Sequence, residues 1–296
     1  MNKILLSLAS IILMVILVNG DCAIDFSSEI SVGISDSEWS CLGQSNQRVI
    51  IQVWSGGDQY NSNISSVVAG AQQGGIQIID LYAFLCSECD GNYPASDAIQ
   101  SLVSSLKSDG INFNMLWIDV EQCDQCWGDL DDNAAYVQEA VETAASLGVN
   151  VGVYSSEGEW PQTVGNLTSL SSYPLWYAHY DDNPSYSDTG FYEFGGWTSP
   201  SMKQYVGSTN QCGVSVDLDF YGSGGDCSTS SGSGNSSGGS SNNSGSSNNS
   251  GGSSNSGSNS GSSNSGSNSG SSNSGSNSGS NSGSASGNSS GSGSSI

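Results

Sequence analysis

Two acidic residues separated by one position, Asp119 and Glu121, offer the clearest possibility of chemistry in this chain. They end an apolar run, residues 115–121, that is typical of a β-strand, so both side chains should point to the same face. Two carboxyl groups held this close repel each other when ionised, which raises the pKa of one of them. One protonated and one ionised carboxyl group are what glycoside hydrolysis requires, because one donates a proton to the leaving oxygen and the other faces the cationic transition state.

Further acidic residues fall at the ends of other expected strands. Asp25 closes the first expected strand, Asp217 begins the last, and Asp219 shares the face of Asp217. A single acid at a strand end is more commonly a helix cap or a loop carboxylate. The first and last strands of a closed barrel are neighbours, however, so these acids could form one ring with the central pair. The alternative for such a ring is a Ca²⁺ or Mg²⁺ site, because both ions prefer oxygen ligands. We predict catalytic carboxylates, with neither a metal nor a cofactor.

The elements that must position these acids alternate between strands and helices. Short apolar runs predict about eight strands, over residues 23–27, 49–54, 76–85, 115–121, 150–154, 175–180, 203–205 and 216–221. Apolar residues three and four apart predict helices over 64–73, 96–109 and 133–147. This alternation implies a parallel sheet, and the number of strands predicts an α/β fold with a single TIM-like (β/α) barrel. Helical patterns are weak after residue 180, so we expect the last part of the barrel to be irregular.

Aromatic residues concentrate near the same expected strand ends. Core packing explains most of them, yet Tyr and Trp also bind sugar rings, because an apolar ring with a polar edge suits a wet cleft. Our candidates for substrate binding are Tyr82, Trp176, Tyr180 and Tyr205. His179 is the only histidine, and the chain has no nucleophile motif, so a Ser-His-Asp hydrolase is poorly supported. Packing is the commoner role for such a histidine.

Composition divides the chain into three parts. An almost unbroken apolar run follows Lys3 and ends in small residues, which is typical of a secretory signal peptide over residues 1–20. Residues 228–296 are almost entirely Ser, Gly and Asn, without charged or aromatic residues, so we expect a disordered tail. Residues 21–227 remain as one domain, which is long enough for a full hydrophobic core.

The chain is strongly acidic. It contains 28 Asp and Glu against 4 Lys and Arg, which gives a formal net charge of -24 at pH 7. This charge excludes nucleic-acid binding by a basic face and argues against docking on anionic membranes. No apolar run of about 20 residues follows the signal, and no apolar segment ends the chain, so we predict neither a membrane span nor a lipid anchor. We expect a monomer.

The cysteines indicate a disulfide-bonded domain. They are Cys22, Cys41, Cys86, Cys89, Cys123, Cys126, Cys212 and Cys227. Behind a signal peptide, eight cysteines indicate up to four disulfides. The first and last lie at the ends of the expected domain, as in disulfides that close a domain, but spacing does not decide the pairing. The two C-x-x-C pairs leave a zinc site open and, with less support, a thioredoxin-like redox pair. Sequons for N-glycosylation stand at Asn63, Asn166, Asn235, Asn242, Asn248 and Asn288.

Several short motifs, taken in order, resemble those of one known family. They are residues 23–27 (AIDFS), 50–53 (IIQV), 82–84 (YAF), 117–121 (WIDVE), 175–180 (LWYAHY), 204–205 (QY) and 216–219 (VDLD). The set resembles the glycoside hydrolase family 25 lysozymes, the Chalaropsis-type muramidases, over nearly all of residues 23–221. The cysteines are not typical of bacterial members and indicate a eukaryotic, secreted version.

This resemblance implies an activity and a partner. The activity is hydrolysis of the β-1,4 bond between N-acetylmuramic acid and N-acetylglucosamine, and the partner is bacterial peptidoglycan. By the resemblance, Glu121 is the proton donor, Asp119 orients the substrate or stabilises charge, and Asp25 and Asp217 are the remaining acids of the cleft. The nucleophile stays open between an enzyme carboxylate and the substrate's own N-acetyl group, because substrate assistance is a known exception to the two-carboxylate scheme.

Two other classes of function remain open. One is a barrel that binds carbohydrate without catalysis, and the other is a secreted coat glycoprotein, which the tail and the sequons suggest. The presence of both Asp119 and Glu121 favours the enzyme. Anionic bacterial walls would repel so negative a chain at neutral pH. We therefore expect a protein that is secreted or that acts in the lumen of an acidic digestive or phagocytic vacuole, where Glu121 is protonated and can serve as an acid.

Overall fold

A computed structural model describes residues 21–56, 59–186, 191–222 and 227. These residues belong to one compact unit of the chain. The expected signal peptide and the expected tail lie outside the described residues. The same holds for the sequons at Asn235, Asn242, Asn248 and Asn288. The other two sequon asparagines, Asn63 and Asn166, are exposed. No helix in the described ranges is long and apolar enough to cross a membrane.

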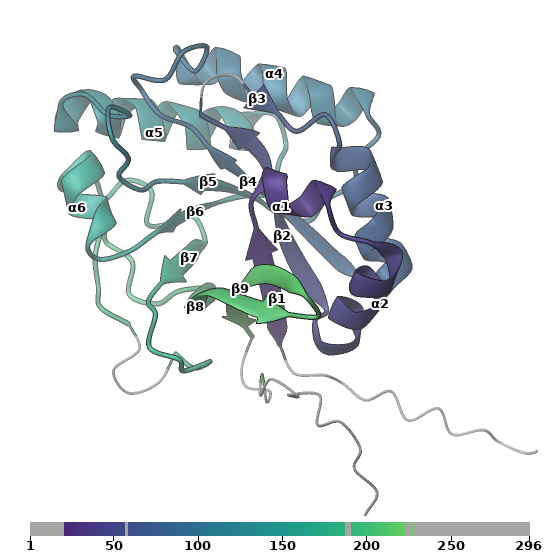
Figure 1. Cartoon of the computed structure of the whole chain (residues 1–296). Coiled ribbons are helices and arrows are strands. Elements are labelled where there is room, and N and C mark those ends of the chain that lie inside the picture. Colours follow the sequence, from purple (N-terminus) through teal and green to yellow (C-terminus); the bar gives the residue numbers. More distant parts are fainter. Residues whose placement is uncertain (1–20, 57–58, 187–190, 223–226, 228–296) are drawn as a thin grey trace, which may run out of the picture. The chain divides into compact units, whose positions relative to one another are not determined.

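Nine strands form one sheet in the described residues. They are β1 (Cys22–Phe26), β2 (Arg48–Ser55), β3 (Gln59–Tyr60), β4 (Ile78–Phe84), β5 (Leu116–Asp119), β6 (Val151–Ser155), β7 (Leu175–Ala178), β8 (Met202–Gln211) and β9 (Val214–Tyr221). The short β3 pairs with the end of β2, and the other strands follow the order β1-β9-β8-β7-β6-β5-β4-β2. Because β2 also pairs with β1, these strands close into a barrel (Figure 1). The predicted α/β barrel is confirmed.

The last part of the barrel is irregular, as expected, and its closing strand runs in the opposite direction to its neighbours. Strands β1, β2 and β4 to β8 are parallel, whereas β9 is antiparallel to both β1 and β8. The expectation of an entirely parallel sheet is therefore wrong at β9. The reason is the connection: only Cys212 and Gly213, both with positive φ, separate β8 from β9. Two residues suffice for a hairpin, while a parallel crossover needs a dozen or more.

Helices lie around the outside of the barrel (Figure 1). They are α1 (Ser28–Val32), α2 (Asp36–Ser45), α3 (Ile64–Gly74), α4 (Ala95–Ser108), α5 (Leu130–Ser146) and α6 (Glu159–Val164). The three predicted helices correspond to α3, α4 and α5. Apolar periodicity does not predict α2, whose buried residues are only Trp39 and Leu42. Its start is nevertheless readable from the sequence, because Ser35 and Glu38 form a capping box.

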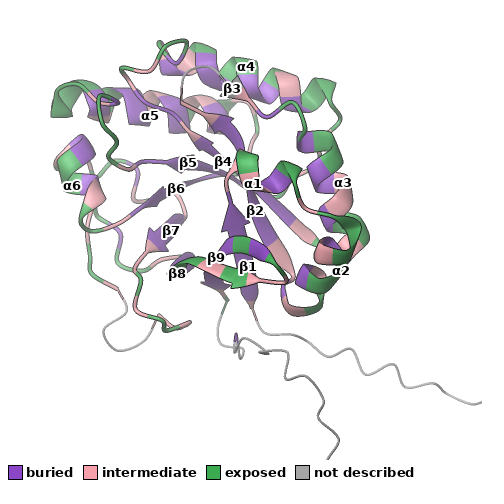
Figure 2. Cartoon of the chain, in the orientation of Figure 1, coloured by how far each residue is buried: buried purple, intermediate pink, exposed green. Residues whose placement is uncertain are grey.

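Successive side chains along each strand point alternately into and out of the barrel, and this separates two apolar layers. Inside the barrel, the buried cluster consists of Ala23, Ile50, Trp117, Tyr154, Trp176 and Met202. Neighbouring strand residues such as Ile24 and Ile51 point outward and join the larger core beneath the helices. Figure 2 shows the strands buried along most of their length, while the helices are exposed on their outer sides. The barrel interior is thus a packed core below the strand ends, not a pore.

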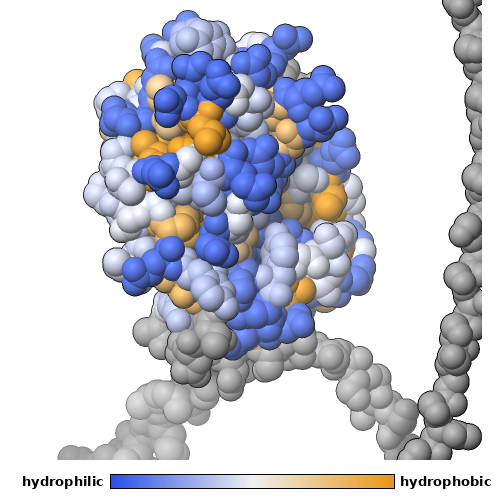
Figure 3. Space-filling model, turned by 90° about the vertical axis from the view of Figure 1, so that its left-hand side faces the viewer, coloured by the Kyte–Doolittle hydropathy of each residue, from blue (hydrophilic) through white to orange (hydrophobic). Residues whose placement is uncertain are grey.

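The outer surface matches the acidic composition. On the face that Figure 3 shows, hydrophilic residues cover most of the area and hydrophobic residues appear as separate small patches. Scattered apolar residues of this kind are usual on a protein surface.

All eight cysteines are paired, so the prediction of up to four disulfides is confirmed. Cys22 in β1 pairs with Cys227, and Cys41 in α2 pairs with Cys212 in the β8–β9 turn. These two disulfides join residues 205 and 171 positions apart, and such long loops restrict the unfolded chain strongly. The two C-x-x-C pairs form local disulfides, so the structure has disulfides where the zinc alternative required thiolates.

The close approach of α2 to α3 yields a stability prediction. A Cβ atom at Gly43 would overlap the carbonyl oxygen of Gly74, whereas a Cβ at Gly33 would meet nothing nearer than 3.8 Å. We expect Gly43→Ala to lower the free energy of unfolding by about 1–3 kcal/mol, because the helices must separate. Gly33→Ala, the matched control, should change it by less than about 0.5 kcal/mol. Urea unfolding measures both, and equal midpoints would contradict this packing.

Candidate active site

Asp119 and Glu121 lie at the end of β5, as predicted. Asp119 is the last residue of the strand and is 5% exposed, while Glu121, two residues further, is half-buried. Oδ1 of Asp119 is buried and has no hydrogen-bond partner among the described residues. A buried carboxylate oxygen without a partner is costly, so it is available for a hydrogen bond from a bound substrate.

Asp25 and Asp217 lie side by side on the other side of the barrel. Strand β1 pairs with β9 in a register that places Asp25 directly opposite Asp217. In the strand order, β1 and β9 are separated from β5 on either side by other strands, so the two pairs of acids face the barrel mouth from different sides. Asp217 also accepts a hydrogen bond from the backbone N–H of Ser208. The structure thus brings these predicted acids to one end of the barrel.

Gln204 of β8 links the acids to two tyrosines. Its Nε2 donates to Oδ2 of Asp25 at 2.8 Å and to Oδ2 of Asp217 at 3.2 Å. Its Oε1 accepts hydrogen bonds from the hydroxyl groups of Tyr154 at 2.7 Å and Tyr180 at 2.9 Å. Gln204 is only 3% exposed, and its bonds to Asp25 and Tyr154 are buried, while those to Asp217 and Tyr180 are partly buried. This amide therefore fixes the positions of two acids and two aromatic rings at once.

The four aromatic candidates divide into two groups. Tyr180 is 62% exposed at the mouth. Tyr82 lies near all four predicted acids: burial is the main cause that raises its pKa, and the charges of these acids raise it further. Trp176 is buried inside the barrel, where its indole N–H donates to Oδ1 of Asp219 at 2.7 Å. Tyr205 packs in the outer core, and its hydroxyl lies 3.5 Å from the carbonyl oxygen of Cys227. The structure therefore brings Tyr82 and Tyr180 to the acids, while Trp176 supports them from below.

A cleft of about 370 Å³ opens beside Glu121. Its lining includes Glu121, Tyr154, Glu157, Glu159, His179 and Tyr180. His179 stacks on the ring of Tyr177, with centroids 5.7 Å apart, so it both packs and lines the mouth. The lining combines carboxylates with aromatic rings, which suits a polar ligand that has apolar faces, such as a sugar.

Three acids of the site have a raised pKa. Burial is the main cause that raises the pKa of Glu121, and the charges of Glu159 and Asp217 add to it. Burial likewise raises the pKa of Asp119 well above its usual range, followed by the charges of Glu121 and Glu159. Burial also raises the pKa of Asp25, with contributions from neighbouring acids. A carboxyl group that stays protonated above its ordinary range is able to serve as a general acid.

The site also contains two residues, Gln204 and Glu159, that the sequence analysis did not name as site residues, although Gln204 belongs to one of its motifs. Gln204 precedes Tyr205, and strand alternation allows only one of the two to face the barrel interior. Met202 points into the interior cluster, so the inward residue two positions later is Gln204. Glu159, at the start of α6, accepts a hydrogen bond from the backbone N–H of Gln122 at 2.7 Å and lies near Glu121 only through folding.

Comparison with known proteins connects this geometry with a family. The family described as Lysozyme-like protein 1 matches residues 20–205. Counting factor 50 of Dictyostelium discoideum is 82% identical over 79% of this chain and 77% of its own length. Probable GH family 25 lysozyme 5 of the same organism is 34% identical over 65% of this chain and 88% of its own length. The chain belongs to the glycoside hydrolase family 25 lysozymes.

A solved structure shows the same fold. The muramidase from Acremonium alcalophilum aligns with a TM-score of 0.53 at 18% identity, over 69% of this chain and 94% of that one. The resemblance inferred from the ordered motifs is therefore confirmed, and by family this lysozyme is a glycoside hydrolase.

The bonds of Gln204 yield a second prediction. Gln204→Met keeps a similar volume but leaves the buried Asp25, the half-buried Asp217 and two tyrosine hydroxyls without these partners. We expect a loss of at least about 2 kcal/mol in the free energy of unfolding, because each buried unpaired group is costly. Gln100→Met, at an exposed position of α4, is the matched control and should change it by less than about 0.5 kcal/mol. A similar small loss in both variants would show that the Gln204 bonds are dispensable.

The raised pKa of Asp219 predicts a pH dependence of stability. Burial raises this pKa to about 7, against the partly opposing hydrogen bonds of Asp25 and Trp176. Between an unfolded pKa of about 3.9 and this value, the folded protein binds more protons than the unfolded chain. The free energy of unfolding should therefore be highest below pH 4 and fall as the pH rises towards 7. Asp219→Asn should flatten this fall by up to about 1.4 kcal/mol per pH unit, measured by urea unfolding. The other raised acids act in the same direction, so an unchanged slope in the variant would exclude Asp219 as a source.

Proposed function

We propose that this chain is a muramidase that hydrolyses the β-1,4 bond between N-acetylmuramic acid and N-acetylglucosamine in bacterial peptidoglycan. The observation that carries the proposal is the pair at the end of β5: Glu121 lines an open cleft, and Asp119 is buried beside it with a carboxylate oxygen that has no partner in the described residues. A proton donor and a second carboxyl group at one cleft are the elements of glycosidic cleavage.

In this proposal Glu121 is the general acid. Its raised pKa keeps part of the population protonated where an ordinary glutamic acid is ionised, and the proton passes to the glycosidic oxygen as the bond breaks. Asp119 assists by accepting a hydrogen bond from the acetamido N–H of the substrate. Asp25 and Asp217 are both held by Gln204. Burial raises the pKa of both, and that of Asp25 strongly, so Asp217 is the one of the two that more readily ionises and supplies negative potential towards the cationic transition state. Tyr82 and Tyr180 offer aromatic surfaces to the sugar rings.

We also propose that the enzyme works outside the cell or in the lumen of an acidic digestive or phagocytic vacuole. The net charge of -24 at neutral pH repels the anionic walls of bacteria. Acid conditions reduce this repulsion, and they also protonate Glu121. Both effects favour activity below pH 7.

A second candidate function arises from the relatives. Counting factor 50 and Counting factor 45-1 of Dictyostelium discoideum are 82% and 66% identical to this chain, and neither name states a hydrolytic activity. If such a protein does not hydrolyse its ligand, the same cleft would still be able to bind a glycan without cleaving it. The aromatic lining fits both candidates, whereas the paired acids at the end of β5 favour hydrolysis.

Clearing of a peptidoglycan suspension between pH 3 and 8 separates the two candidates. We expect the wild type to clear it with an optimum below pH 7 and Glu121→Gln to be at least about 100-fold slower, because general acid catalysis typically contributes that much. Glu142→Gln, on the exposed face of α5, is the matched control and should clear at the wild-type rate. New reducing ends should carry muramic acid.

Three outcomes would count against the proposal. An optimum above pH 7 would contradict the acidic compartment, and equal rates for wild type and Glu121→Gln would remove Glu121 as the acid. Absence of clearing by a correctly disulfide-bonded wild type that still binds peptidoglycan would establish the binding function instead.

A further inference from the structure

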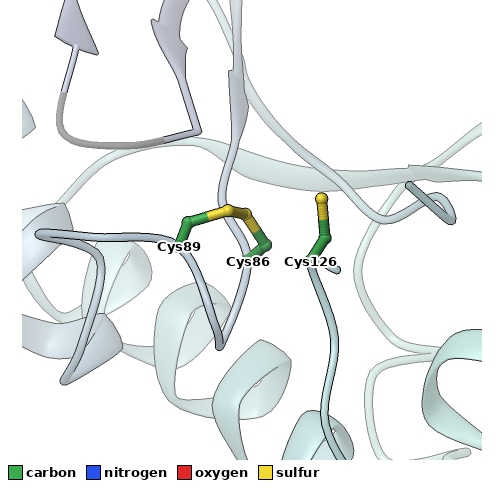
Figure 4. Close-up of side chains that lie close together, drawn as sticks. All are labelled: Cys86, Cys89 and Cys126. Carbon is green, nitrogen blue, oxygen red and sulfur yellow. A yellow bond between two sulfur atoms is a disulfide. The ribbon is translucent and has the colours of Figure 1, made fainter. Parts of the chain in front are cut away.

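Two neighbouring loops carry four cysteines, and three of the four sulfur atoms lie together where the loops meet. The loop between β4 and α4 carries Cys86 and Cys89, and the loop between β5 and α5 carries Cys123 and Cys126. Each loop closes its own disulfide. The Sγ atoms of Cys86, Cys89 and Cys126 nevertheless all lie within 4.8 Å of one another, and Figure 4 shows them side by side. Sulfur atoms of two separate disulfides are thus almost in contact.

Hydrogen bonds hold the two loops together without a covalent link between them. The backbone N–H of Glu88 donates to the carbonyl oxygen of Cys126 at 3.0 Å. The N–H of Gly128 donates to Oγ of Ser87 at 3.4 Å, and this hydroxyl donates to Oδ1 of Asn133 at 2.8 Å. These hydrogen bonds hold the two loops against each other without the sulfur atoms, and the sulfur of Cys126 lies within 4.8 Å of both sulfur atoms of the other disulfide.

The four side chains differ in their access to solvent. Cys123 is exposed and Cys89 is half-buried, whereas Cys86 and Cys126 are 0% and 8% exposed. A thiol from solution reaches Cys123 most easily. Attack at Cys123 releases Cys126, whose sulfur atom is the one in its loop that lies against the other disulfide.

We propose that these four cysteines form a thiol–disulfide exchange site that reacts with a small monothiol, and that exchange moves the disulfides from within the loops to between them. First, the monothiolate bonds to Cys123, the Cys123–Cys126 bond breaks, and Cys126 leaves as a thiolate. Next, Cys126 bonds to Cys86, and Cys89 leaves as a thiolate. Finally, Cys89 bonds to Cys123 and expels the monothiolate. Two disulfides exist before and after, so there is no net oxidation or reduction and the monothiol is regenerated.

Solvent access determines which sulfur atom Cys126 attacks. Attack at Cys86 expels Cys89, whereas attack at Cys89 would expel Cys86, which is fully buried. A half-exposed thiolate is better solvated than a buried one and is the better leaving group. The products are therefore Cys86–Cys126, between the two buried residues, and Cys89–Cys123, between the two accessible ones.

Exchange replaces two small disulfide-closed rings by two large ones. Each local disulfide joins residues three positions apart, whereas Cys86–Cys126 closes a ring of about 40 residues, which restricts the unfolded chain more. We expect the Tm to rise by roughly 4–8 °C. The loop that becomes anchored also carries Glu121, whose carbonyl oxygen accepts a hydrogen bond from the indole of Trp127 at 2.8 Å. The exchange itself does not depend on the proposed hydrolytic function.

Trypsin separates the two loops and makes the test direct. Cleavage after Arg48, Lys107 and Lys203 yields peptides 49–107 and 108–203, which contain these four cysteines and no others. The full-length protein is incubated with reduced glutathione at pH 8, free thiols are blocked with a maleimide, and N-glycans are removed enzymatically. Digestion without reduction is followed by mass spectrometry. We expect the two peptides to become joined by two disulfides, and peptides that stay separate would overturn the proposal.

Single substitutions test the order of the steps. Cys123→Ser leaves Cys126 as a thiol, so the peptides should join without added glutathione and leave one free thiol at Cys89. Cys126→Ser, the matched control, lacks the attacking sulfur and should give at least 10-fold less of the joined product. Equal joining in the two variants would overturn the proposed relay. Four free thiols with a bound zinc ion in the native mass spectrum of the wild type would also overturn it, because no disulfide would exist to exchange.

Discussion

The burial of several carboxyl groups at one end of the barrel is the constraint on which the site depends. Asp119 and Asp219 each keep a buried oxygen that has no partner in the described part of the chain. Burial and mutual repulsion favour their protonated forms, so this end of the barrel holds protons above the ordinary range of carboxyl groups. Gln204 is neutral, so it organises two of the acids without cancelling their charge. The neighbouring cation, Lys203, is bound to Asp181 instead.

Closure of the barrel produces this concentration of acids. The two-residue turn between β8 and β9 makes β9 antiparallel, and the same register that pairs β9 with β1 sets Asp217 against Asp25. A disulfide fixes the turn to α2, and a second one fixes the start of β1 to Cys227. The covalent links that close the longest loops therefore lie in the irregular part of the barrel, where the described residues after β7 form no crossover helix.

The cleft and the four-cysteine group occupy neighbouring parts of the same barrel end. Strands β4 and β5 are adjacent in the sheet, so the loops that follow them must run side by side. One of these loops carries Glu121 near its start and also the second C-x-x-C pair. The geometry of the cleft at Glu121 and the pairing of two cysteines are thus properties of one short segment.

The sequence by itself determined the alternation of strands and helices, the strand-end position of Asp119 and Glu121, and the family, because hydrophobic periodicity and ordered motifs are local properties. It also indicated how many disulfides form. Only the tertiary structure decided that β9 is antiparallel, that Gln204 and not Tyr205 faces the acids, that Trp176 lies below the site, and which cysteines meet. These features depend on register and on contacts between residues far apart in the chain, such as Asp25 and Gln204. Such contacts are set when the barrel closes, and no local pattern encodes them.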